Sequence, residues 1–515
     1  MNTAQEMPRR QVLESLSGLL LALFVAMISS TVVSTALPLI IGSLNGTQTQ
    51  YTWVVTATLL TATATTPVWG KLADLFNKKS LVQIAIVIFV IGSVLAGMSQ
   101  NTGQLIAARA LQGIGVGGLQ ALVQVVIAAI IPPRERGKYN GYLGGVMAVA
   151  TVGGPLLGGL IVDVPWLGWR WCFFVGVPIG LLAFIVLQRT LRLETVRRPD
   201  AKVDYLGAGL IAAGVSVLLI WVSFVGNSFD WLSWQTALMV GGGLAVLAVA
   251  VWVESRVAEP VVPLKIVVSR TPALAIIASL AVGMAMFGGA VFLGQYFQVG
   301  RGYSPTEAGL LTIPLMAGVL VSSTIAGRMI SRSGSIKPYI VAGSIILVFG
   351  FLGLGFVDHD TSLVYVSGAM LLAGVGVGMT LQNLVLAVQN TVPLRDLGSA
   401  SASVTFFRSL GGTIGVSVLG AVLANRVTAD LTAKLGGHVA PGGDGVSALN
   451  LAALPPEVQV AVREVYGDAT AHIFLISAAV AVVGVVASLL LRPTRLRSTI
   501  DLEEQDKVVN DPIVG

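Results

Sequence analysis

The chain has 515 residues, of which 55% are hydrophobic and only 11% are charged, whereas a typical soluble domain is about 25% charged. So few charges cannot cover a soluble surface, and the mean hydropathy of +0.84 indicates a polytopic membrane protein. A single cysteine, Cys172, excludes a disulfide framework, a thiolate zinc site and a CxxC redox pair. The net charge of +6 therefore raises the question of which membrane side the basic residues face.

Fourteen segments are long and apolar enough to cross a bilayer, which takes about 20 residues in a helix. They lie near 16–41, 51–72, 79–98, 102–131, 138–162, 171–189, 204–226, 235–254, 271–297, 306–330, 338–357, 362–391, 398–425 and 469–491. The first is too long for the apolar core of a cleaved signal, so we expect it to remain as a helix. The sequence thus predicts an all-α membrane protein.

The basic residues alternate from loop to loop. If both termini are cytoplasmic, the loops on that side hold 24 of the 31 Lys and Arg residues, the opposite loops hold five, and Arg109 and Arg408 lie inside helices. Adding or removing one helix would destroy this asymmetry. We therefore expect fourteen helices in the cell membrane with both termini in the cytoplasm, and the basic charge reflects orientation, not nucleic-acid binding.

An offset of 261 residues superimposes two parts of the chain. It places LQGIGVG (111–117) on LAGVGVG (372–378) and PPRERG (132–137) on PLRDLG (393–398), with eight identities across 111–137. Parallel repeats of this kind predict two six-helix halves in a pseudo-two-fold arrangement, with a substrate site between them. The expected domains are a first half at 1–190, a linker with two inserted helices at 191–265, a second half at 266–495 with an outer loop at 427–468, and a cytoplasmic tail at 496–515.

Four motifs resemble one transporter family. Residues 70–82 (GKLADLFNKKSLV), 105–113 (LIAARALQG) and 153–159 (GGPLLGG) resemble the loop, helix 4 and helix 5 signatures of the major facilitator superfamily. Residues 31–38 (TVVSTALP) resemble the end of helix 1 in its fourteen-helix drug exporters. With the inserted helix pair, the resemblance covers essentially the whole chain and points to the drug/proton antiporter branch of QacA/EmrB-like multidrug exporters. It implies the major facilitator fold.

The loop motif after helix 2 is interpreted as a gate between the cytoplasmic ends of the halves. Gly70 permits a close backbone approach, and the Asp74 carboxylate suits the positive N-terminal end of a neighbouring helix, expected to begin near Leu397. Family exporters usually have Gly at the position of Asn77 and Arg at that of Leu75; because Asn tolerates the left-handed conformation, we expect the turn to survive with one charge fewer. The alternative is a set of solvated loop charges. The gate residues are Gly70, Asp74, Lys78 and Lys79.

Two further motifs lie inside helices. Arg109 is roughly 10 Å from the outer end of its helix, where a cation costs about 3 kcal/mol, so it needs partners such as Gln112 and the helix 1 backbone. It either pins helix 4 to helix 1 or also couples protons or substrate. The segment with Gly154, Pro155, Gly158 and Gly159 offers no side-chain chemistry and predicts a bend and a packing surface between the halves.

The residue that couples transport to protons is not evident. Antiporters of the branch that this chain resembles commonly carry an acid in helix 1, where this sequence has Ser29 and Ser30. Asp163 and Glu307 are the acids near the membrane and could each carry a proton. We expect structural roles instead, at an interface for Asp163 and at a helix N-terminus for Glu307.

The predicted substrate cavity is aromatic and rich in amides. Arg408 should lie near the midplane and needs backbone, amide or aromatic partners, a substrate with negative charge or a π face, or packing within the second half. The cavity candidates are Ser29, Gln120, Gln124, Phe287, Gln382, Asn383, Phe407 and Arg408. Such a lining favours bulky, weakly polar compounds and gives no reason for a strict preference for cations.

These features predict a secondary active transporter that exports hydrophobic or amphiphilic compounds, including antibiotics, from the cytoplasm in exchange for protons. Alternatives are a dedicated exporter of an endogenous metabolite or lipid and, from another class, a channel or a non-transporting membrane sensor. An enzyme is not expected, since His359, His438 and His472 lie far apart and no Walker loop or nucleophile motif occurs. The expected partners are small-molecule substrates, protons and the lipid bilayer, with no cofactor, metal or nucleic acid, and the protein is expected to act as a monomer.

Overall fold

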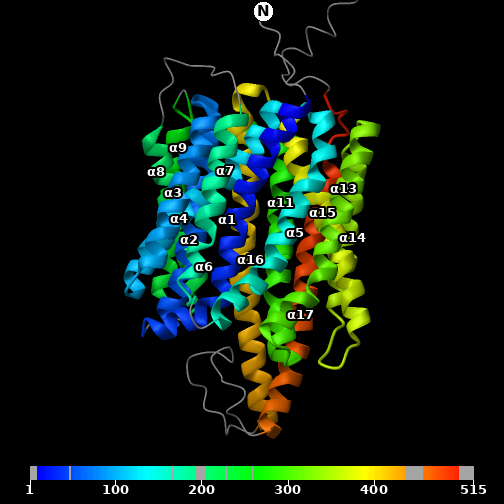
Figure 1. The fold of residues 1–515 in the computed structure, drawn as a ribbon. Coiled ribbons are helices and arrows are strands. Elements are labelled where there is room, and N and C mark those ends of the chain that lie inside the picture. The colour runs from blue at the N-terminus through cyan, green and yellow to red at the C-terminus, as the bar shows by residue number, and fades with distance from the viewer. Residues whose placement is uncertain are drawn as a thin grey trace, which may run out of the picture.

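The computed structural model describes residues 9–45, 48–164, 167–191, 204–226, 229–257, 259–435 and 456–497. In these ranges the chain forms one bundle of long helices that run side by side (Figure 1). The elements are α1 (Arg9–Ser43), α2 (Gln48–Leu75), α3 (Lys78–Met98), α4 (Thr102–Ile130), α5 (Pro133–Asp163), α6 (Trp171–Phe174), α7 (Gly176–Thr190), α8 (Tyr205–Phe224), α9 (Trp234–Glu254), α10 (Leu264–Val267), α11 (Arg270–Gln295), the π-helix η1 (Tyr296–Gly300), α12 (Pro305–Leu311), α13 (Ile313–Ser333), α14 (Lys337–Leu354), α15 (Leu363–Gln389), the 3₁₀-helix η2 (Leu394–Asp396), α16 (Leu397–Leu435) and α17 (Pro456–Leu490).

The predicted all-α membrane architecture is confirmed. Within the described residues, 13 helical segments are long and apolar enough to cross a membrane. The threonine-rich α2, with 28 residues, is a further long helix. Counting α6 with α7 and α12 with α13 as one segment each, the long helices correspond one to one with the predicted spans.

The helices pack in two groups. Most contacts of α1 to α7 are with one another, as are those of α11 to α17; α5 is an exception, because its largest contact is with α13. The inserted pair α8 and α9 pack together at one flank of the bundle, and α8 also contacts α2 and α16 (Figure 1). The main contacts between the two groups are α5 with α13 and α2 with α16. We call α1–α7 the first half and α11–α17 the second half.

Several helices begin where a polar side chain accepts a hydrogen bond from the first turn. Asn101 does so for α4, Asp204 for α8 and Ser362 for α15. Such N-caps satisfy amide donors that have no partner inside the helix, and each contributes about 1 kcal/mol. The apolar runs that follow them then stay helical because a bilayer leaves no other way to satisfy the backbone.

The segment that we expected as an outer loop, 427–468, is helical at both of its described ends. α16 continues to Leu435 and α17 begins at Pro456, and both project well beyond the bundle (Figure 1). The run is too polar to predict a membrane span, but Val427 and Leu431 keep the helical spacing and are buried. Ion pairs within α16 and between α16 and α17 add local support.

The two ends of the bundle differ in charge. The end from which α3, α5 and α14 begin carries Lys78, Arg136 and Lys337, and we call it the basic end. It lies at the top in Figure 1. The opposite end carries the α14–α15 loop with Asp360.

Candidate functional site

Asp74 joins the two halves at the basic end. Its Oδ1 accepts a hydrogen bond from the backbone N–H of Gly398 at 2.7 Å, and its Oδ2 accepts from the N–H and the hydroxyl of Ser399 at 2.8 and 2.6 Å. Gly398 and Ser399 stand in the first turn of α16, where amide donors lack helical partners and the helix dipole favours a negative charge. We call these three bonds the Asp74 latch.

The neighbours of Asp74 complete the motif in different ways. Gly70 lies so close to Ala402 and to the carbonyl oxygen of Gly398 that a Cβ would not fit. Lys78 is near enough to interact electrostatically with Asp74. Lys79 instead donates to the carbonyl oxygen of Gln188 at 2.7 Å, at the end of α7, and so contacts the first half.

The turn between α2 and α3 does not use the left-handed conformation that we expected of Asn77. Asn77 has φ −63° and caps α3, with its side chain accepting from the N–H of Lys79 at 2.9 Å. This side-chain cap on α3 accounts for the Asn at this position. Leu75, which stands where family exporters usually have Arg, is buried.

α5 and α13 form the counterpart of the α2–α16 contact. Gly137 packs against the backbone of Gly327 and the hydroxyl of Ser331, as Gly398 packs against Gly70. The same offset of 261 residues relates Gly137 to Gly398 and Gly70 to Ser331, so the sequence repeat appears as a pseudo-two-fold interface. Farther along, Gly141 and Gly144 face Thr324 and Ser323. Sequence analysis missed this row, although its spacing places it on one helix face.

The helix 5 motif packs partly within the first half and partly against the second half. Gly154 lies against Thr31 of α1, and the Thr31 hydroxyl donates to the carbonyl oxygen of Ala150 at 2.9 Å. This contact is inside the first half, not between the halves. Gly158 is buried, and a Cβ on Gly159 would meet Thr306 of α12 at 3.5 Å. Pro155 lies within α5, which runs as one helix from Pro133 to Asp163.

More polar contacts join the halves near the basic end. Arg136, only 3% exposed, donates from Nη1 to Gln389 Oε1 at 2.9 Å, and Gln389 donates to Ser401 Oγ at 3.0 Å. Deeper in the bundle, Gln124 Nε2 donates to Gln382 Oε1 at 2.8 Å. Two predicted cavity residues are therefore bonded to each other across the interface, and Arg136 is a contributor that sequence analysis missed.

The segment after α17 also crosses the interface. Arg497 donates from its backbone N–H to Asn390 Oδ1 at 3.0 Å and from Nη2 to the carbonyl oxygen of Gln389 at 2.7 Å. Its own carbonyl oxygen accepts from the N–H of Arg134, at the start of α5, at 3.0 Å. The beginning of the predicted tail is thus bound between the two halves.

Arg109 lies in a buried polar network of the first half. Its Nη1 donates to Gln112 Oε1 at 2.5 Å, and Gln112 Nε2 donates to Ser29 Oγ at 3.1 Å and Ser93 Oγ at 2.7 Å. The network joins α4 to α1 and α3, through the Ser29 side chain of α1 and not its backbone. Ser29 is only 2% exposed, so it belongs to this network and not to the cavity for which it was proposed.

Of the two acids considered for proton coupling, the structure describes the side chain of Glu307 only. Glu307 forms a capping box at the start of α12, accepting from the N–H and the hydroxyl of Ser304, both at 2.8 Å. Its side chain is exposed, which fits the structural role. The side chain of Asp163 lies outside what the structure describes.

Arg408 has an incomplete set of partners. Its Nη1 is buried and has no hydrogen-bond partner in the part of the chain that the structure describes. Phe406 and Phe407 precede it, with ring centroids 5.0 Å apart. Of the other candidates, Phe287 packs on Gly412 of α16, Gln120 is half-buried, and Asn383 donates to the carbonyl oxygen of Met379 on its own helix. The structure does not gather these side chains into one polar cluster.

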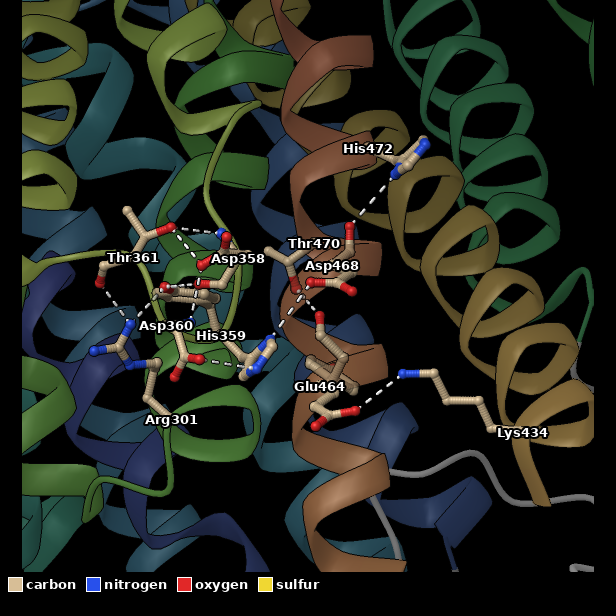
Figure 2. Close-up of polar contacts among 12 residues, drawn as sticks. Arg301, Asp358, His359, Asp360, Thr361, Lys434, Glu464, Asp468, Thr470 and His472 are labelled. Carbon is tan, nitrogen blue, oxygen red and sulfur yellow. Dashed lines mark hydrogen bonds and ion pairs between the residues drawn. The ribbon is translucent and has the colours of Figure 1, made fainter.

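Charged side chains also gather at the opposite end, as Figure 2 shows. His359, in the α14–α15 loop, lies 3.3 Å from Asp360 and 3.7 Å from Asp468 of α17. His472 contacts the carbonyl oxygen of Asp468 at 3.4 Å, so two histidines that are far apart in sequence meet at one residue, whereas His438 lies outside the described residues. The hydroxyl of Thr361 donates to Asp358 and holds the pKa of that carboxyl below its usual value. No group of three metal-ligating side chains occurs among the residues described.

Two parallel halves joined by breakable polar contacts, with an inserted helix pair at their flank, define a secondary transporter of the membrane-spanning type. The chain belongs to the Major Facilitator Superfamily, whose sequence signature matches residues 19–416. It is therefore a transporter and not an enzyme.

Known proteins resemble the chain over most of its length. It is 35% identical over 480 residues to an uncharacterized MFS-type transporter of Mycobacterium tuberculosis, covering 93% of this chain and 69% of that protein. It is also 35% identical over 420 residues to the Multidrug transporter protein MdtP of Bacillus subtilis, covering 82% and 77%. The solved structure of the proton:xylose symporter XylE shares the fold with a TM-score of 0.63 at 14% identity, covering 96% of this chain and 99% of XylE.

Proposed function

We propose that this transporter exports hydrophobic or amphiphilic compounds from the cytoplasm in exchange for protons, by alternating access between the two halves. The Asp74 latch carries the proposal, because three hydrogen bonds to one carboxylate close one end of the interface and can break together. A closure that forms and breaks at one end is what alternating access requires. Similarity to a protein named as a multidrug transporter supports drugs as the cargo.

The orientation follows from charge. The loops predicted for the cytoplasmic side hold 24 of the 31 Lys and Arg residues, and Lys78, Arg136 and Lys337 of this set lie at the basic end. We infer that this end faces the cytoplasm together with both termini. The Asp74 latch then closes the cytoplasmic entrance. Export requires that this entrance opens to load the substrate and closes before release.

The residues between the halves suggest the substrate class. Gln124 and Gln382 are neutral amides that would become available when the basic end opens and their mutual hydrogen bond breaks. Phe407 is aromatic, and Arg408 Nη1 has no hydrogen-bond partner among the described residues. This composition suits bulky, weakly polar molecules and does not require a positive charge on the substrate. A carboxylate or an aromatic face would both be accommodated beside Arg408.

Uptake into everted membrane vesicles tests the proposal. Ethidium serves as a cationic probe and a fluorescein ester as an acidic one, with an acid-inside pH gradient imposed or collapsed by nigericin. We expect uptake of at least one probe to stop when the gradient collapses, and to be absent in vesicles without the protein. Uptake that persists after collapse would contradict proton antiport and favour a channel. Gradient-driven transport of a single compound would favour a dedicated exporter.

A further inference from the structure

A second charged cluster lies where the inserted helices meet α2. Lys71, one helical turn before Asp74, is 5% exposed, and its Nζ forms an ion pair with Glu259 Oε2 at 2.5 Å. Glu259 belongs to the segment that connects α9 to α10. A buried ammonium group requires such a partner. The ion pair therefore ties the helix that carries the latch to the inserted helices.

Two buried carboxylates face each other beside Lys71. Asp204 is 8% exposed, and its Oδ1 accepts from the N–H of Gly207 at 2.8 Å. Glu254 is 4% exposed and accepts from the N–H groups of Val261 and Val262 at 3.1 and 3.0 Å. Asp204 Oδ2 and Glu254 Oε1 both lie so close to Gly207 that a Cβ on this glycine would clash with each of them. Glu254 experiences the charges of both Asp204 and Lys71.

One oxygen of this pair lacks a donor. Asp204 Oδ2 is buried and has no hydrogen-bond partner among the described residues. Among the described residues, the cluster with Glu259 sets three carboxyl groups against one ammonium group, and two facing carboxylates resist ionising together. A proton held between Asp204 Oδ2 and Glu254 Oε1 would supply the missing hydrogen bond and remove one excess charge.

We propose that Asp204 and Glu254 form a proton-binding site that shares one proton at the junction of the latch helix and the inserted helices. The pair holds the proton while the basic end is closed. When that end opens and water reaches the pair, the carboxyl O–H bond breaks and the proton passes to water on that side, which leaves two negative charges. As a step in drug/proton antiport, this release rests on the proposed function.

The inserted helices can transmit the change because they contact both halves. Ile211, Val215 and Leu219 of α8 form a buried cluster with Phe406 of α16, against which Leu60 of α2 packs. Repulsion between two ionised carboxylates at the end of α8 and α9 therefore acts on helices that straddle the interface. Loss of the proton should loosen this packing and favour opening of the basic end.

A cysteine reporter tests the site without any substrate. Cys172 is the single cysteine of the chain, so a Cys172→Ser, Ser331→Cys protein carries one thiol at the buried α5–α13 contact. In everted vesicles, a membrane-impermeant maleimide measures how often this contact opens. We expect labelling, divided at each pH by the rate for an exposed model thiol so that thiolate formation cancels, to accelerate as pH rises from about 6 to 8, by up to about tenfold per pH unit for one proton.

Asp204→Asn removes the proton site but keeps the cap of α8. Asn caps helices as well as Asp does, so α8 should persist, while the ionisable partner is lost and the corrected labelling rate should stay slow and independent of pH. Glu14→Gln, which neutralises an exposed acid of α1, is the matched control and should keep the slope of the parent. An Asp204→Asn profile that follows the parent, or a parent profile that is flat, overturns the proposal.

Two measurements keep the test decisive. If Asp204→Asn fails to reach the membrane, Glu254→Gln replaces it with the same expected and contrary outcomes. Infrared spectra of the purified protein at neutral pH should show a protonated-carboxyl band in the parent that Asp204→Asn lacks, and an unchanged band contradicts the site. Because neither measurement needs a substrate, failure of drug/proton antiport would appear separately, in vesicle uptake.

Discussion

Asp74→Asn should shift the transporter toward an open basic end. The Asn side chain keeps one acceptor oxygen, but its amide group faces an N–H donor and loses at least one of the three bonds to Gly398 and Ser399. Hydrogen bonds to a charged group contribute about 1.5–3 kcal/mol each, and the helix N-terminus adds up to about 1 kcal/mol for the lost charge. A loss of about 2–4 kcal/mol changes the ratio of open to closed forms by about 30-fold to several hundred-fold.

The Ser331→Cys reporter measures this shift directly, since Ser331 lies in the symmetric contact between α13 and α5. Asp74→Asn should raise its labelling rate strongly and abolish export while leaving the amount of protein in the membrane unchanged. Ser399→Ala removes a single hydroxyl bond to the Asp74 carboxylate and should raise labelling by about tenfold to 150-fold. Glu14→Gln again serves as the control acid. Normal labelling and full export in Asp74→Asn would show that Asp74 is an ordinary loop charge.

Other substitutions probe the remaining candidates in the same vesicles. Arg109→Ala should abolish export with the membrane level unchanged on immunoblots, since Gln112, which bonds α1 and α3, loses its Arg109 partner. Glu307→Gln keeps a side-chain acceptor for the capping box and should lower uptake less than about fivefold; complete loss would make Glu307 the coupling residue. Arg408→Ala should reduce uptake of the fluorescein ester about tenfold more than that of ethidium, and equal losses would refute an anion-selective role. Topology reporters should read cytoplasmic at Asn77 and external at Asp360, and a cytoplasmic reading at Asp360 would contradict the fourteen-helix topology.

The parts of the molecule that could be predicted are those set by local physics. Apolar length and loop charge determine the helices, because the bilayer imposes both. The partner of Asp74 could also be anticipated, since a helix N-terminus attracts a carboxylate and the repeat indicated which helix begins there. Asn77 shows the limit of such reasoning, because capping and a left-handed turn are both compatible with Asn and the backbone selects one.

Contacts between distant segments were not predictable from residue type. Gln124 and Gln382 suggested a cavity lining, yet a single hydrogen bond pairs them across the interface. Ser29 was proposed for the same cavity and instead accepts from Gln112. An amide or a hydroxyl has the same chemistry in a cavity and in a sealed contact, so its surroundings decide its role. In the sequence, Arg136 is indistinguishable from an ordinary basic loop residue. Only the structure shows that its partner, Gln389, lies in the other half.

Lys71 and Asp74 indicate why the inserted helices are mechanically connected to the latch. The two residues are three positions apart on α2, within one helical turn, so they move as a rigid unit. Asp74 holds the first turn of α16, whereas Lys71 holds Glu259 beside the inserted pair. A rotation of α2 that releases α16 therefore also changes the position of Lys71 relative to Glu254 and Glu259. The energy of the charged cluster thus enters the balance between the closed and open forms, and a proton on Asp204 and Glu254 alters that balance without touching the latch itself.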